Sequence, residues 1–231
     1  MTRLESGAFA HCASLVSVDW SDKLTAIGDN AFIDCKLLVS LGDLSSVTAI
    51  EHFAFAGCSS LERLEHLDNL VSLGEGVFGY GSHYTGCISL KSIGDMPKLE
   101  SMKQKCFMGC TALETVGDLS SLKEIPYEAF DGCTSLVSIG DLSNVTIIGS
   151  YGFNQCKKLT SIPNLGSLES VNQSAFSGCE SLALLGNLRN LTSFGYLPFY
   201  NCPNLVLEVL PDSAAEQYAK DYNMQYTYIT E

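Results

Sequence analysis

Cysteine recurs along this chain at a nearly constant interval. Nine of the ten cysteines follow one another at intervals of 23 residues, with a single interval of 29 between Cys58 and Cys87. They are Cys12, Cys35, Cys58, Cys87, Cys110, Cys133, Cys156, Cys179 and Cys202. Leucine stands three residues after each of these nine cysteines, and phenylalanine stands three residues before eight of them. A fixed period in the twenties with constant apolar positions predicts a solenoid, in which each repeat forms one coil and the stacked coils share one core.

The unit that begins at Tyr127 shows the internal pattern of a coil. From Cys133 onward its apolar residues recur at every third position, as Cys133, Leu136, Ile139, Leu142, Val145 and Ile148. A spacing of three matches neither the 3.6-residue period of a helix nor the two-residue period of a strand. It is typical of a tight coil whose short strands are broken by corners. We therefore predict two strands, at 137–140 and 146–149, and a helical turn at 127–133 that leads into the next coil.

The predicted fold is a mainly β solenoid of α/β type with about nine coils of 23 residues. Its cysteines share a repeat position with phenylalanine and leucine nearby, so we expect a stacked, buried ladder of free thiols. Neighbouring rungs would lie roughly 5 Å apart, but their parallel side chains would need backbone movement to form a disulfide. Cys106 replaces an alanine beside the repeat phenylalanine and should also be buried. The sequence contains no Cys-x-x-Cys pair, so we predict no metal site at these cysteines.

Residues 79–85 interrupt the repeat between Phe78 and Cys87. Insertions in solenoids emerge as loops on one face, where binding residues often lie. Tyr80, His83 and Tyr84 are therefore candidate binding residues, although an ordinary surface loop is the alternative interpretation.

The repeat ends near residue 210. In the following segment, Ser213 and Glu216 form a capping box, which predicts a helix, and 225–229 alternates like a closing strand. We predict a solenoid at 1–210 and a C-terminal helix-strand cap at 211–231, which would cover the last coil.

Charge and hydropathy exclude several kinds of partner. The chain has 26 acidic and 13 basic residues, a net charge of −13, whereas nucleic-acid binding requires basic patches and anionic membranes attract basic segments. No apolar run reaches the roughly 18 residues of a membrane span, so we expect no membrane insertion. The N-terminus lacks the apolar core of a secretory signal and enters the repeat directly, which suggests sequence upstream. If Met1 is the true start, the reduced thiols favour a cytoplasmic location.

The repeated motif carries a family resemblance. The segments IGDNAFIDCKLLVSL and IPYEAFDGCTSLVSI share the pattern IGxxAFxxCxxLxxI, which resembles the BspA-like leucine-rich repeats of bacterial and some protist surface proteins. The closing PDSAAEQYAKDYNMQYTYI is similar to the segment that often ends such arrays. The resemblance covers essentially the whole chain and implies a leucine-rich-repeat solenoid. It also implies a location at the cell surface or outside the cell, and adhesion to matrix proteins or other cells.

Polar and aromatic residues also recur at fixed positions. Asp95, Asp118 and Asp141 come from consecutive coils; their carboxylates could bind calcium or cap the amides of the following corner. A ladder of hydroxyl side chains could accept an extended peptide or a glycan, or could simply be solvated: Ser17, Ser40, Ser92, Thr115, Ser138 and Ser161. Exposed tyrosines are favoured contact residues, which makes candidates of three tyrosines near the turn, Tyr127, Tyr151 and Tyr196.

The sequence has no catalytic motif. It contains no Gly-x-Ser-x-Gly elbow, no phosphate-binding glycine loop and no His-Glu-x-x-His segment, so we predict neither an enzyme nor a cofactor. We expect a binding or adhesion module that presents a repetitive face to a protein or glycan partner. A structural stalk or an intracellular scaffold is the alternative. A monomer is expected, although the open first coil leaves end-to-end association as a second option.

Overall fold

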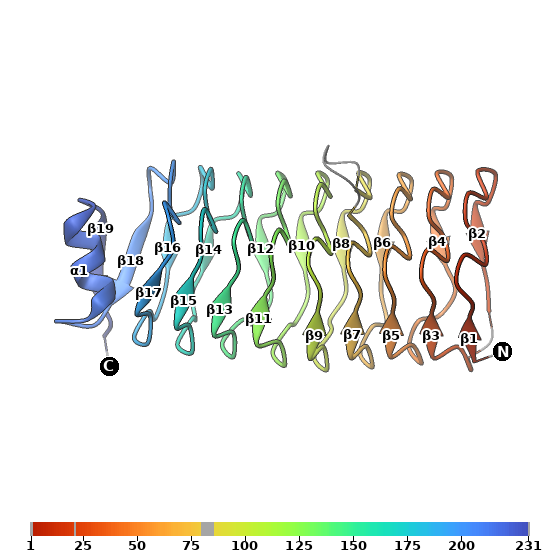
Figure 1. Ribbon diagram of the computed structural model, residues 1–231, viewed down its shortest axis with the longest axis horizontal. Coiled ribbons are helices and arrows are strands. Elements are labelled where there is room, and N and C mark those ends of the chain that lie inside the picture. Colours follow the sequence, from red (N-terminus) through yellow and green to blue (C-terminus); the bar gives the residue numbers. More distant parts are fainter. Residues whose placement is uncertain (1, 21, 80–85, 231) are drawn as a thin grey trace.

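The computed structural model describes residues 2–20, 22–79 and 86–230. Its coils stack along one straight axis, and the two ends of the chain lie at opposite ends of the stack (Figure 1). The fold is thus the predicted mainly β solenoid, in which each repeat of the sequence makes one coil.

Each coil contributes two short strands. The strand that follows the cysteine is β2 (Ser17–Val18), β4 (Ser40–Leu41), β6 (Arg63–Leu64), β8 (Ser92–Ile93), β10 (Thr115–Val116), β12 (Ser138–Ile139), β14 (Ser161–Ile162), β16 (Leu184–Leu185) and β18 (Val206–Val209). The other strand is β1 (Arg3–Leu4), β3 (Ala26–Ile27), β5 (Ala49–Ile50), β7 (Ser72–Leu73), β9 (Ser101–Met102), β11 (Glu124–Ile125), β13 (Ile147–Ile148), β15 (Ser170–Val171) and β17 (Ser193–Phe194). The strands predicted at 137–140 and 146–149 contain β12 and β13 and are confirmed.

Strands of neighbouring coils pair in parallel, with equivalent residues opposite one another. Thr115 pairs with Ser138, and Val116 pairs with Ile139. Because side chains alternate across a strand, Thr115 and Ser138, the first residues of their strands, face outward. Val116 and Ile139, the second residues, face the core. The register thus reproduces the repeat of the sequence one coil at a time.

The parallel sheets are interrupted at three places, two of which coincide with proline. β9 does not pair with β11, nor β12 with β14, and Pro126 and Pro163 directly follow β11 and β14. In uninterrupted coils the residues equivalent to these two prolines are Gly149 and Gly140, which donate their N–H groups to Ile125 O at 2.7 Å and to Val116 O at 3.0 Å. Proline has no N–H to donate, so the ladder loses a hydrogen bond at these two positions.

The predicted helical turn is wrong. In residues 127–133 the N–H groups of Glu128, Phe130 and Gly132 donate to carbonyl groups of the next coil at 3.0, 2.8 and 2.9 Å. Alternate N–H groups donate within the segment, as from Cys133 to Phe130 O. Glu128 and Gly132 have φ of 53° and 75°, whereas an α-helix needs uniform right-handed residues bonded to the fourth preceding carbonyl. We call the seven residues that end at each repeat cysteine the turn segment; before Cys87, where residues 79–85 are inserted, it begins at Glu75.

Phenylalanine and cysteine form the centre of the core. Successive repeat phenylalanine rings stack with centroids 5.1 to 5.9 Å apart. The Cys133 thiol donates to Phe107 O of the preceding coil at 3.1 Å, and the Cys156 thiol donates to Phe130 O at 3.2 Å. The thiol therefore fills the core and also satisfies a carbonyl oxygen.

The ten cysteines are all free, and Cys106 is buried as predicted. The ladder of nine is not buried throughout, however, because Cys12 is exposed and Cys202 is only partly buried. These two thiols belong to the first and last coils, where a neighbouring coil covers only one side. The expectation of nine buried rungs therefore holds for the seven inner ones.

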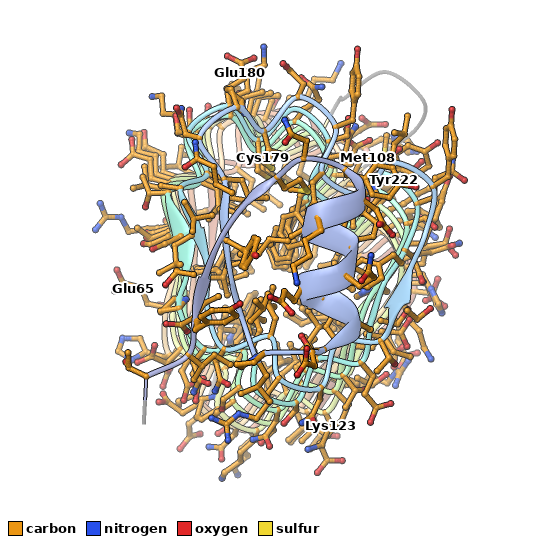
Figure 2. All side chains as sticks on the ribbon, turned by 90° about the vertical axis from the view of Figure 1, so that its left-hand side faces the viewer. Glu65, Met108, Lys123, Cys179, Glu180 and Tyr222 are labelled. Atoms are coloured by element: carbon orange, nitrogen blue, oxygen red, sulfur yellow. The ribbon has the colours of Figure 1, made fainter. Side chains whose placement is uncertain are left out.

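The chain closes with helix α1 (Ala214–Asp221) and strand β19 (Gln225–Tyr228). Ser213 caps α1 by accepting from the Glu216 N–H, and β19 extends the sheet of β18 in parallel. Figure 2 shows α1 lying across part of the end of the solenoid. Within the described residues, no helix combines the length and apolarity needed to cross a membrane.

Candidate functional site

Exposed and partly buried side chains form a row where each coil enters its turn segment. The row consists of residues at the first two positions of successive turn segments: Asp29, His52, Phe53, Glu75, Gln104, Lys105, Tyr127, Glu128, Tyr151, Gln173 and Tyr196. We call it the corner row. Because the coils are in register, these side chains are stacked along the solenoid axis although they are far apart in the sequence.

The backbone explains why this corner presents large side chains. Lys105, Glu128 and Tyr151 occupy the second position of their turn segments with φ of 62°, 53° and 58°. Other copies have glycine or asparagine there, such as Gly76 and Asn30, the residue types that adopt positive φ most readily. Hydrogen bonds to neighbouring coils fix the backbone of the segment. Because the backbone is fixed in this way, larger residues can occupy a strained conformation there.

Tyr127 and Tyr151 are the centre of the corner row. Their ring centroids lie 6.0 Å apart with an interplanar angle of 89°, an edge-to-face contact favoured by the aromatic quadrupole. Gln173 Nε2 donates to the Tyr151 hydroxyl at 2.9 Å. On the other side, Lys105 Nζ lies 5.9 Å from the centroid of the Tyr127 ring, within the range of a cation–π interaction.

The Glu128 carboxylate interacts with both Lys105 and Tyr127. Lys105 Nζ lies 3.5 Å from the Glu128 carboxylate, and hydrogen bonding with Glu128, followed by partial burial, raises the pKa of Tyr127 to about 12. Tyr127 is 40% exposed. It therefore offers a neutral aromatic surface to a partner at physiological pH.

A cleft of about 380 Å³ adjoins the corner row at the interruption between β9 and β11. Its lining residues are His52, Glu75, Met102, Lys103, Gln104, Glu124, Pro126 and Tyr127. Gln104 Nε2 donates to Glu75 Oε1 at 2.9 Å, and the Glu75 N–H donates to His52 Nδ1 at 2.9 Å. The cleft is thus a mixed aromatic and polar surface with its histidine already hydrogen-bonded.

The structure brings together some of the predicted binding residues. Tyr127 and Tyr151 are in contact, whereas Tyr196 is 71% exposed and lies two coils beyond Tyr151 on the same row. Tyr80, His83 and Tyr84 lie outside the described residues. Sequence reasoning missed Lys105 and the glutamines, which an alignment of all copies at the first two turn positions would have placed on the row.

The aspartate ladder caps corners. Ser120 donates to Asp118 through its N–H at 2.8 Å and its hydroxyl at 3.0 Å, and Ser143 does the same to Asp141. Asp95 accepts from the Asp118 N–H at 2.9 Å. These contacts are the amide capping that competes with the calcium interpretation.

A different acidic cluster forms where sequence reasoning found none. Within the described ranges, ligand atoms of Asp29, Glu51 and His52 lie within 4.8 Å of one another. Asp29 Oδ1 accepts from the His52 N–H at 3.0 Å, and Glu51 lies 3.8 Å from Arg3. These groups already stabilise the corner, so we assign no metal to them.

Comparison with known proteins places the chain in a family. Residues 1–84 and 80–206 match the model of the BspA type leucine rich repeat region, with six copies. A leucine-rich repeat protein from Bacteroides ovatus, known from its crystal structure, is 28% identical with a TM-score of 0.82, covering 100% of this chain and 58% of that one. A leucine rich cell surface protein from Faecalibacterium prausnitzii is 23% identical with a TM-score of 0.50, covering 94% and 65%.

The chain therefore spans less than two thirds of the length of these two solved relatives. No protein of curated function matches it. Members of the matched family are generally repeat scaffolds without catalytic activity. The register of the coils, the leucine after each cysteine and the match over most of its length show that the chain belongs to the BspA-type leucine-rich-repeat family.

Proposed function

We propose that this chain is a non-catalytic binding module whose corner row and adjoining cleft contact a protein or glycan partner. The observation that carries the proposal is the alignment of aromatic and amide side chains on consecutive coils, centred on Tyr127 and Gln173, which are exposed, and Tyr151, which is partly exposed. Tyrosine rings provide apolar contact area and a polar tip in one rigid side chain, and such residues contribute strongly to binding interfaces.

Rigidity supports the same proposal. The turn segments are tied to their neighbours by backbone hydrogen bonds such as Glu128 N–H to Ser150 O at 3.0 Å, so the row is held in place before a partner arrives. A preorganised surface loses little conformational entropy on binding. Family membership supports a location at the cell surface, where adhesion would take place.

A stalk is the second candidate function. The uninterrupted phenylalanine stack runs from Phe9 to Phe199, as a rigid spacer would need. A spacer tolerates changes of its surface residues, whereas a binding module does not.

Binding measurements distinguish the two functions. The purified chain is screened against arrays of matrix proteins and glycans, with Tyr127→Ala and Tyr151→Ala as test variants and Val137→Ala as control. Val137 is 41% exposed, close to the 40% of Tyr127, but lies beside β12 rather than on the corner row. Loss of an interface tyrosine is expected to weaken binding by about tenfold or more. Equal binding by all three variants, or no binding by the wild type, would favour the stalk.

A further inference from the structure

In most turn segments three N–H groups donate to the coil that follows; among the described residues, the segment that ends at Cys58 and the one that begins at Glu75 each show two such bonds. In the penultimate coil, Ser174 donates to Tyr196 O at 3.0 Å, Phe176 donates to Pro198 O at 2.8 Å, and Gly178 donates to Tyr200 O at 2.8 Å. The donors are alternate residues because left-handed residues in the segment turn their N–H groups to the same side. The acceptors are always backbone carbonyl oxygens.

The last coil repeats this conformation without a following coil. Its equivalent donors are Leu197, Phe199 and Asn201, and two of these residues keep the positive φ of the repeat, 48° at Leu197 and 56° at Asn201. Within the described parts of the chain, none of the three N–H groups has an acceptor. Aligned N–H groups of this kind form a site of partial positive charge that attracts oxygen ligands.

The three donor residues line a cleft. It has a volume of about 430 Å³ and is lined by Leu197, Phe199, Tyr200, Asn201, Cys202, Pro203, Leu205, Tyr218, Tyr222, Asn223, Met224 and Gln225. We call it the terminal cleft. Strand β19 pairs with β18 and so covers the strand side of the last coil. Tyr222 lies at one end of α1 in Figure 2 and lines the terminal cleft together with residues of the turn segment. Tyr200 and Tyr222 are 63% and 60% exposed.

Charge selects the kind of oxygen ligand. The lining of the terminal cleft contains no ionisable acid or base apart from tyrosine and cysteine, and the chain carries a net charge of −13. An anion approaching the cleft would be repelled by that net charge, whereas a neutral amide carbonyl would not. Peptide carbonyls are also the groups that the same three donors bind in the inner coils, and a sugar has no comparable row of carbonyl acceptors.

We propose that the terminal cleft binds a short peptide segment of a protein partner. The segment's alternate carbonyl oxygens would accept from Leu197, Phe199 and Asn201, and its side chains would pack between Tyr200 and Tyr222. A peptide bound in the terminal cleft would add one more segment to the hydrogen-bond ladder that joins successive turn segments. The inference names a site and a partner class for the binding function proposed above, and it rests on that function.

Hydrogen exchange tests the premise. The amides of Leu197, Phe199 and Asn201 are expected to exchange rapidly, and those of Ser174, Phe176 and Gly178 slowly, because only the latter three are hydrogen-bonded. Slow exchange at the three terminal amides in the free protein would mean that the donors are already occupied, and would overturn the proposal.

The binding experiment selects peptides from a random library on the immobilised full chain. A selected peptide is expected to shift the amide resonances of Leu197, Phe199 and Asn201, and Tyr200→Ala or Tyr222→Ala is expected to weaken it by about tenfold. Val137→Ala is the control, because Val137 is also an exposed apolar side chain but lies outside both the terminal cleft and the corner row.

An ester in place of the Phe199 amide removes one donor and leaves every side chain unchanged. The variant is made by ligation at Cys179. It should fold because the Phe199 N–H has no acceptor among the described residues, and the ester keeps Pro198 O, as a weaker acceptor, opposite the Phe176 N–H; circular dichroism checks the fold. The loss of one hydrogen bond is expected to weaken the peptide about three- to tenfold. Unchanged affinity would overturn the proposal.

The outcomes separate the two proposals. Peptides that shift only resonances of the corner row, or glycans that occupy the terminal cleft in their place, would overturn this inference and leave the binding module standing. Failure of every peptide, protein and glycan to bind would overturn both.

Discussion

At the scale of single residues, the molecule depends on the pair formed by each repeat phenylalanine and the cysteine of the next coil. Each inner thiol donates to the carbonyl of the phenylalanine one coil earlier, as Cys133 does to Phe107. A serine would offer a stronger donor but lose apolar volume, and an alanine would leave the carbonyl with one partner fewer. The small, weakly polar thiol meets both demands of this position.

Thiol reactivity should report the position of each cysteine along the stack. Burial raises the pKa of Cys110 to about 12 and also raises the pKa of Cys133, and the thiolate is the reactive form. Under native conditions iodoacetamide is expected to label Cys12 first, Cys202 more slowly and the inner cysteines only after denaturation, as checked by peptide mass spectrometry. Rapid native labelling of Cys133 would contradict a dry core.

Loss of one inner phenylalanine ring should be costly. Phe130 is fully buried between Phe107 and Phe153, and Phe130→Ala is expected to lower the free energy of unfolding by about 3–5 kcal/mol, measured by urea denaturation. Phe9→Ala is the matched variant, because Phe9 stacks on one ring only and is partly buried. Phe9→Ala should lower the free energy of unfolding by a clearly smaller amount. Equal decreases in the two variants would contradict the cooperative stack.

At the scale of elements, one carboxylate connects the parts of the C-terminal cap. Glu216 accepts from Lys220 Nζ at 2.8 Å, from the Tyr228 hydroxyl at 2.6 Å and from the Asp212 N–H at 2.9 Å. This side chain therefore connects α1 to β19 and to the loop before the helix. The interaction with Lys220, then that with Tyr228, lowers the pKa of Glu216 from 4.5 to about 2.

The stability of the cap should consequently decrease at low pH. A carboxyl whose pKa is lowered by folding stabilises the folded state fully above its unfolded value of 4.5, and the contribution disappears as the pH falls toward about 2. The melting temperature is expected to fall over this interval in the wild type, and Glu216→Gln is expected to be less stable at neutral pH and to lose this part of the pH dependence. The same acid profile in both proteins would show that other carboxyl groups cause it.

At the scale of the whole molecule, the solenoid is a chain of nearest-neighbour contacts. Strands pair with the coil before and after, and the hydrogen bonds of the turn segments also join adjacent coils. The stability of such an array is approximately a sum over coils and the interfaces between them. Coils near both ends therefore have fewer contacts, as the exposure of Cys12 shows.

Removal of one complete repeat should be tolerated. Deletion of residues 134–156 removes one 23-residue unit and keeps every remaining position in register; we expect a folded protein with a lower urea midpoint and unchanged circular dichroism per residue. Deletion of 134–155 leaves one residue too many and shifts each later side chain by one position, which should place core residues on the surface. Equal stability of the two deletions would contradict a register-based core.

The sequence by itself determined the coil, the core positions and the two strands, because a periodic apolar pattern can be buried in only one repeating way. It also placed Tyr127 and Tyr151 near one corner. The conformation of the turn segments was decided by the tertiary structure, since positive φ at Glu128 and Tyr151 is held by hydrogen bonds to neighbouring coils. The contacts of Lys105 and Gln173 with the tyrosines, and the unpaired N–H groups of Leu197, Phe199 and Asn201, likewise exist only because coils stack and the last one has no successor.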